Sequence, residues 1–194
     1  MNFMKVSLLV ATLGVLSSVR AVAGPFGVDS TDGFDLDQYE CSEIAKAFYS
    51  CENVPKPHPD FEQYIVQYHP EVGVCMIKGV GKDIQDNRYG GSTVSAVDEI
   101  YGQVSSKYGE VKKFDYLMTG SIWDEPEDWM MGLAKDERTY AYFGEITPVV
   151  DGISKYIVAG KASRSDVGYV IVEFHTPVTD DCDTKASDDA ASSF

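Results

Sequence analysis

The residue types best suited to chemistry gather in one short segment, residues 121–131. This segment holds four carboxylates and two tryptophans: Asp124, Glu125, Glu127, Asp128, Trp123 and Trp129. Indole rings stack on sugars and on peptide side chains. Carboxylates serve as general acids and bases, or hold a cation. The segment therefore predicts either a ligand-binding surface built on the two tryptophans or a small hydrolase site built on the four carboxylates.

A structural role explains the same residues. Asp124 followed three residues later by Glu127, with Pro126 between them, is typical of the start of a helix. We expect this helix to run to about Ala134, with Trp129 on the side that faces the core. Glycoside hydrolysis also needs two carboxylates several ångströms apart across a cleft, which neighbours in sequence do not provide. The pattern thus favours the structural role, and an enzyme is the weaker alternative.

Other candidates for metal binding or catalysis are scattered. Five acids lie near the start of the predicted mature chain: Asp29, Asp32, Asp35, Asp37 and Glu40. Aligning Gly33 with the glycine of a calcium-binding EF-hand loop places Val28 and Tyr39 at the first and last ligand positions, so the calcium pattern fails. Neither His58 nor His69 has metal-ligand spacing to a cysteine, and no Gly-x-Ser-x-Gly motif marks a nucleophile. We therefore expect no metal ion and no cofactor.

The four cysteines predict disulfide bonds. An even number in an oxidising compartment indicates two bridges, for which three pairings exist. Cys41 and Cys51 are close in sequence with a chain reversal expected between them, which favours Cys41–Cys51 and leaves Cys75–Cys182 to hold the C-terminal segment on the sheet. Cys75 also lies inside the apolar run 72–77, so a buried free thiol is the alternative.

Residues 1–23 are typical of a secretory signal peptide. Lys5 gives the basic start, residues 6–19 are apolar or small, and a small-x-small cleavage site ends at Ala23. The apolar stretch is too short for a stable membrane span, and no later run is long enough to cross a bilayer. We expect the mature chain to begin at Gly24 and to be periplasmic or secreted.

The chain is strongly acidic, with a formal charge of −15 from 16 basic and 31 acidic residues. Removing Lys5 and Arg20 with the leader leaves 14 basic residues against 31 acidic ones, a mature charge of −17. Such a charge repels nucleic acid and anionic lipid surfaces. It favours a cationic envelope or extracellular protein as the partner, with plain solubility as the alternative explanation.

The hydrophobic pattern predicts alternating strands and helices. The clearest hairpin joins residues 64–68 and 72–80. The clearest helix begins at Ser92 or Thr93 and ends at Gly109. We also expect a short helix within residues 36–47 and strands at the following ranges: 47–54, 111–118, 139–144, 154–162 and 168–175.

This order of elements indicates an α+β domain. We expect a two-layer arrangement in which an antiparallel sheet carries one main helix and one or two short ones. The single domain is predicted to cover residues 24–179, beginning with an exposed loop or short strand over 24–37. Residues 180–194 are acidic and then rich in Ala and Ser, so we expect a disordered tail.

Three separated blocks resemble a known family. They are Gly24-Pro25-Phe26-Gly27, the proline segment Val54–Pro59, and Gly120–Leu133. In this pattern the chain is similar to a family of small uncharacterised exported bacterial proteins, over most of its mature length. The resemblance implies a periplasmic or secreted bacterial protein and implies no activity or site residues. We predict a non-catalytic binding or interaction domain, with a small extracytoplasmic hydrolase as the alternative.

Overall fold

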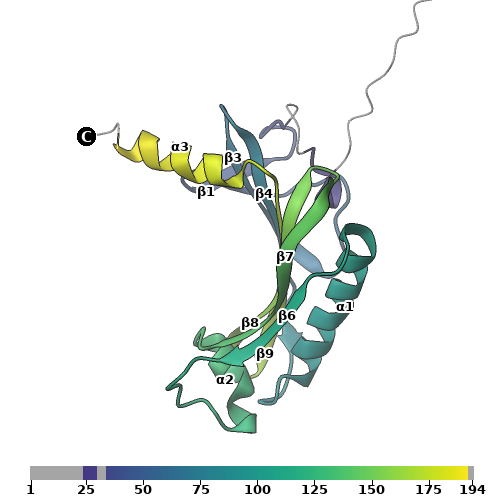
Figure 1. Ribbon diagram of the computed structural model, residues 1–194, viewed down its shortest axis with the longest axis vertical. Coiled ribbons are helices and arrows are strands. Elements are labelled where there is room, and N and C mark those ends of the chain that lie inside the picture. Colours follow the sequence, from purple (N-terminus) through teal and green to yellow (C-terminus); the bar gives the residue numbers. More distant parts are fainter. Residues whose placement is uncertain (1–23, 30–33, 192–194) are drawn as a thin grey trace, which may run out of the picture.

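The computed structural model describes residues 24–29 and 34–191. Nine strands form one antiparallel sheet in the order β1-β2-β3-β4-β9-β8-β7-β6, and the short β5 also pairs with β9. The strands are β1 Cys41–Ala45, β2 Phe48–Cys51, β3 Phe61–His69, β4 Gly73–Gly81, β5 Ile84–Gln85, β6 Lys112–Leu117, β7 Arg138–Val150, β8 Ile153–Arg164 and β9 Val167–His175. The sheet is strongly bent and carries the helices α1 Gly91–Tyr108, α2 Trp129–Ala134 and α3 Thr179–Ala191 (Figure 1).

The expected α+β class and antiparallel sheet are confirmed. Alternate residues of a strand point to opposite faces, and on β9 Val172 and Phe174 point towards α1 while Glu173 points away. Gln67 lies on that second face, where its side chain donates to Asp183 of α3 at 2.7 Å. Helices therefore lie against both faces, α1 on one and α3 on the other (Figure 1), which differs from the simple two-layer arrangement that we expected.

The main core lies between α1 and the sheet. Val97 and Ile100 of α1 pack with Tyr156 and Val158 of β8, and all four side chains are buried. The helix and β9 approach so closely at Gly168 that a Cβ there would lie 2.2 Å from a Thr93 side-chain atom. Glycine at this position therefore sets the distance between helix and sheet.

The helix start differs from the prediction, whereas its end is confirmed. The N-cap is Gly90, and Thr93 lies inside the first turn. Asp86 caps the helix from outside, because one of its carboxylate oxygens accepts both the backbone N–H of Thr93 at 2.6 Å and the Thr93 hydroxyl at 2.8 Å. At the other end, the Gly109 N–H donates to the Ser105 carbonyl at 2.9 Å.

Most predicted strands are present, but the helix within residues 36–47 is absent. A turn ends at Glu40 and is followed by β1, which forms a tight hairpin with β2. Ala47 has a positive φ of 63° at the hairpin turn, which no helix accommodates. The apolar Tyr39, which we assigned to the buried face of this helix, is instead buried by stacking on Phe34.

Both preferred disulfide pairs are confirmed. Cys41–Cys51 joins the two strands at one edge of the sheet. Cys75–Cys182 joins β4 to α3 across 107 residues of sequence. The free-thiol alternative for Cys75 is thereby wrong.

Both ends of the described chain differ in part from the prediction. Gly24, Pro25 and Val28 are buried, whereas Asp35 and Asp37 of the expected loop over 24–37 are exposed. The segment 180–194, expected to be disordered, is helical as far as Ala191 within α3. Its polar sequence gives no apolar stripe, and the helix is instead held by the disulfide and by Thr179, whose hydroxyl donates to the Cys75 carbonyl at 2.6 Å. No helix in the described ranges is both long and apolar enough to cross a bilayer.

Candidate functional site

The predicted tryptophan and carboxylate segment forms a short turn followed by α2. Pro126–Asp128 is a 3-10 turn, so α2 begins at Trp129, later than predicted, and ends at Ala134 as predicted. The capping box between Asp124 and Glu127 is not formed, since the turn is capped at Glu125 without a side-chain hydrogen bond.

Trp129 is used for packing. Its ring contacts Tyr140 edge-to-face at a centroid distance of 5.8 Å, and the Arg138 guanidinium lies 5.7 Å from its centre. The backbone of Gly90 approaches so closely that an added Cβ would lie 2.1 Å from a Trp129 ring atom. Trp123 is half-buried nearby, and a Cβ added at Gly132 would lie 3.7 Å from the Trp123 Cβ atom. Trp129 therefore holds the start of α1 against α2.

The four carboxylates of the segment differ in their surroundings. Asp124 and Glu125 are exposed, and Glu127 is half-buried. Asp128 forms an ion pair with Arg88 at 3.3 Å, which fixes the loop before α1 to the turn before α2. The four acids are neighbours in sequence, but Asp128 is used in a structural contact with Arg88.

The other predicted candidates are separate from one another. Asp35 accepts the backbone N–H groups of Asp37 and Gln38 at 2.9 and 3.3 Å and so closes a turn. Asp32 lies outside the described residues. Within residues 24–29 and 34–191, no group of three or more His, Cys, Asp or Glu side chains is arranged to hold a metal ion. His69 is buried at a hairpin turn, where its Nδ1 accepts the Glu71 N–H at 3.2 Å.

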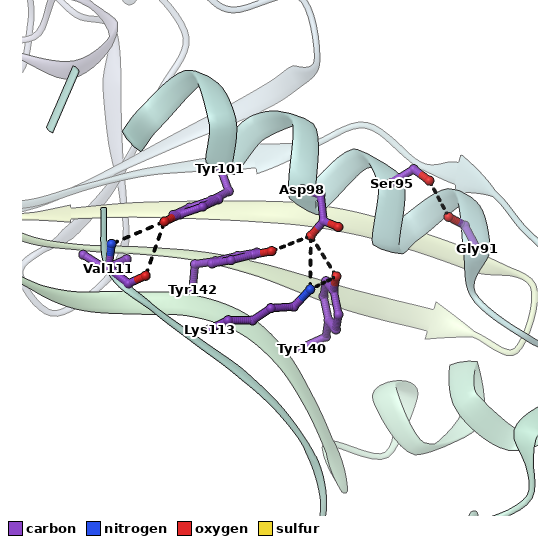
Figure 2. Close-up of polar contacts among 8 residues, drawn as sticks. All are labelled: Gly91, Ser95, Asp98, Tyr101, Val111, Lys113, Tyr140 and Tyr142. Carbon is purple, nitrogen blue, oxygen red and sulfur yellow. Dashed lines mark hydrogen bonds and ion pairs between the residues drawn. The ribbon is translucent and has the colours of Figure 1, made fainter. Parts of the chain in front are cut away.

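A polar network that the sequence did not reveal joins α1 to the edge of the sheet. The Asp98 carboxylate accepts the hydroxyls of Tyr140 and Tyr142 at 2.7 and 2.9 Å, and Lys113 of β6 donates to the Tyr140 oxygen at 2.6 Å. Figure 2 shows these side chains converging between α1 and the strands. Tyr101 stacks on Tyr142 at 3.7 Å between ring centres.

The protonation states of this network suit a structural role. Burial raises the pKa of Tyr140 to about 12, and its bond to Asp98 adds to the rise, while Lys113 opposes it. The hydrogen bond with Tyr140 raises the pKa of Lys113, which therefore stays charged. At neutral pH both tyrosines are therefore neutral and the lysine is charged, and the two tyrosine hydroxyls are engaged by the Asp98 carboxylate. The network fixes β6 and β7 to α1.

A second group of charged side chains, half-buried, lies on the sheet face away from α1. Glu173 pairs with Lys78 at 3.0 Å, and the Nε2 atom of His175 lies 3.5 Å from the Glu173 carboxylate. Interaction with His175, together with Lys78, lowers the pKa of Glu173 to about 2. This group links β4 to β9.

The candidate ligand site with the most apolar lining residues is an open cavity of about 330 Å³ beside the C-terminal half of α1. Its walls are the 3-10 turn Pro25–Gly27, residues 56–59, α1 and β9. Most of its lining is apolar: Pro25, Phe26, Pro57, Pro59, Phe61, Ile100, Val104, Tyr108, Val172 and Phe174. Its volume lies at the lower end of the range of small-molecule sites.

Two segments far apart in sequence build the outer wall of this cavity. The prolines of residues 55–59 hold the chain extended and remove backbone donors. The Lys56 N–H donates to the Phe26 carbonyl at 2.9 Å, so the proline segment and the N-terminal turn lie side by side. The Phe26 ring is held edge-on by Phe61, Tyr64 and Phe174 at 5.6, 4.8 and 6.0 Å. These contacts preform the wall.

The polar groups of the cavity stand at its rim. His58 Nε2 and Gln103 Oε1 are 2.9 Å apart, which joins the proline segment to α1. His58 Nδ1 accepts the Asp60 N–H at 3.3 Å, which assigns the ring hydrogen to Nε2. Lys56 and Lys107 also line the cavity, and of the described lining residues none is Asp or Glu.

Sequence reasoning did not identify this site because four separate segments form it. Residues 24–27 and residues 56–59, which belong to two of the three blocks quoted for the expected resemblance, lie together in its wall. No family model, curated protein or solved structure matches the chain. The geometry of the cavity therefore supplies the basis for a function.

Proposed function

We propose that the chain is an exported bacterial envelope protein, periplasmic or secreted, whose domain binds a ligand without catalysing a reaction. The binding site is the cavity between residues 24–27, residues 56–59 and α1. The observation that carries this proposal is a preformed, mostly apolar cavity with a few polar groups gathered at its rim, an arrangement typical of small-molecule sites.

Export is supported by two independent features. Residues 1–23 have the pattern of a cleaved leader. The two disulfides belong to compartments that keep thiols oxidised. Both features favour the periplasm or the extracellular medium.

The charge of the domain supports a cationic protein as an additional partner. The mature charge of −17, from 14 basic and 31 acidic residues, would speed the approach of a basic envelope protein and make that association weaken as salt rises. The hydrolase alternative, built on the carboxylates of residues 121–131, has less support because Asp128 is paired with Arg88 and Trp129 packs, half-buried, against Gly90 and Tyr140.

The test uses the oxidised mature protein, residues 24–194, and the neutral apolar probe 1-octanol. We expect saturable changes in the amide NMR signals of Gly27 and Gln103 as the probe is added. Val104→Trp fills the cavity and abolishes these changes. Val94→Trp is the matched control, because Val94 is equally half-buried on α1 but does not line the cavity. Absence of saturable binding, or equal binding by both variants, would overturn the proposal.

A further inference from the structure

We infer that this cavity accepts an amphipathic anion, a single apolar chain with a carboxylate or phosphate head, whose head lies at Lys56 and Lys107. This inference rests on the proposed function, namely that the cavity binds a ligand. It adds the chemical class of that ligand and the direction in which the ligand lies.

The apolar part of the ligand is defined by the floor and wall of the cavity. Phe26, Phe61 and Phe174 meet edge-to-face there, and Val104 of α1 closes one side. These side chains offer no hydrogen-bonding group to a polar chain. Burying an apolar chain against them is favourable because it removes apolar surface from water.

The anionic head is indicated by the charge at the rim. In a chain with a net charge of −15, this cavity is lined by the two lysines Lys56 and Lys107 and, within the described residues, by no carboxylate. Lys56 is exposed and its ammonium group forms no ion pair in the described part of the chain. Lys107 is paired with Asp151 at 2.7 Å and lies 4.9 Å from the Tyr108 ring centre, so it is held in place at the rim. Lys56 is thus the cation most available to a ligand.

A neighbouring cavity fixes the direction of the ligand. This second cavity, of about 220 Å³, shares the side chains of Phe61 and Ile100 with the first. Its lining contains three acids, Asp60, Asp83 and Glu99, beside one lysine, Lys82. An anionic head is repelled from that end and attracted to the Lys56 end, so the two cavities differ in the sign of charge that they accept.

Leader cleavage at the predicted position would strengthen this preference. Gly24, the first residue after the expected cleavage site, itself lines the cavity. Cleavage after Ala23 creates an α-ammonium group at Gly24, which carries a positive charge below its usual pKa of about 8. The exported form would then present one more cation to the anionic head than the precursor does.

The experiment compares octanoate with 1-octanol, which share an apolar chain and differ in the head group. We expect octanoate to bind at least about threefold more tightly to the mature protein at low salt, the size of one exposed ion pair. Raising the salt concentration weakens octanoate binding and leaves octanol binding unchanged, because salt screens only the charged head.

Variants at the rim locate the effect. Lys56→Gln lowers the preference for octanoate to about one, and Lys56→Glu reverses it. Lys135→Gln removes an exposed lysine far from the cavity lining and is the matched control. Octyl phosphate is the second arm: tighter binding than octanoate assigns a phosphate head, and weaker binding assigns a carboxylate.

The outcomes separate the two proposals. If neither octanol nor octanoate binds in a saturable way, the proposed binding function fails. If both bind with equal affinity and Lys56→Gln changes neither, the cavity binds an apolar ligand but the inferred anionic head is wrong. A loss of preference in Lys135→Gln equal to that in Lys56→Gln also overturns the inference, because the effect then comes from overall charge.

Discussion

Replacing Glu173 with glutamine tests the charged group that joins β4 to β9. The carboxylate lies 3.0 Å from Lys78 and 3.5 Å from the Nε2 atom of His175, and its side chain is 19% exposed. On the neighbouring strand β8 it faces Ile157, which offers no alternative hydrogen-bond partner. Glu173→Gln removes the negative charge and leaves the Lys78 ammonium without its partner.

The size of the effect follows from the pKa of Glu173. A fall from the usual 4.5 to about 2 in the folded protein corresponds to a stabilisation of about 3 kcal/mol at neutral pH. Because the folded state lowers this pKa, the stabilisation is fully present above about pH 5 and is lost as the pH falls from 4.5 towards 2. The difference between the native protein and the variant is therefore expected to narrow from about 3 kcal/mol at pH 7 to about 1 kcal/mol at pH 3.

The assay is urea unfolding, followed by tyrosine and tryptophan fluorescence with the disulfides intact, at several pH values between 7 and 3. Glu62→Gln is the matched control, because Glu62 is an exposed glutamate on β3 of the same sheet. A difference that stays constant over this pH range would refute the reasoning. So would an equal loss of stability in Glu62→Gln.

Three further predictions concern packing and connectivity. Gly90→Ala combines a positive φ of 74° with a Cβ placed 2.1 Å from the Trp129 ring, so we expect a loss of at least ~2 kcal/mol in unfolding free energy, and a native-like melting temperature would contradict this. Cys182→Ser opens a loop spanning 107 residues and should lower stability by about 4 kcal/mol, with limited proteolysis then cutting within α3; an uncut α3 would be the contrary result. Asp86→Ala removes the acceptor of two Thr93 hydrogen bonds, and we expect urea unfolding to show a loss of about 1 kcal/mol in unfolding free energy. Asp86→Asn keeps a side-chain oxygen as acceptor, so its loss should be smaller, and an equal loss in both variants would contradict this explanation.

The elements that the sequence predicted are those with strong local periodicity. The helix ending at Gly109 and the hairpin of β3 and β4 have a clear apolar pattern, and both are present. Helix α3 was missed because its stability comes from a disulfide and a polar anchor at Thr179, which are long-range contacts. Strand β1 was missed because most of its side chains are exposed, so it has no alternating apolar pattern. The apolar Tyr39 just before it instead fitted the spacing of a helix.

The candidate site was harder to predict than the fold. Residues 121–131 were the predicted site because tryptophans and carboxylates are common in binding and catalytic sites. In the structure, however, Trp129 packs against Gly90 and Asp128 pairs with Arg88. The cavity depends on Phe26, Lys56 and Phe174, which lie far apart in sequence and have no shared motif. Only the pairing of strands and the packing of α1 bring them together.

The open sheet leaves two edges, β1 and β6, with backbone groups that a strand of another molecule could join. Each edge carries features that oppose such growth into fibres. On β6 the side chains of Lys112 and Lys113 are exposed, and on β1 the register shifts between Glu43 and Ala45. Charged side chains and irregular register both disfavour edge-to-edge aggregation. The sheet can therefore stay open at both edges without polymerising.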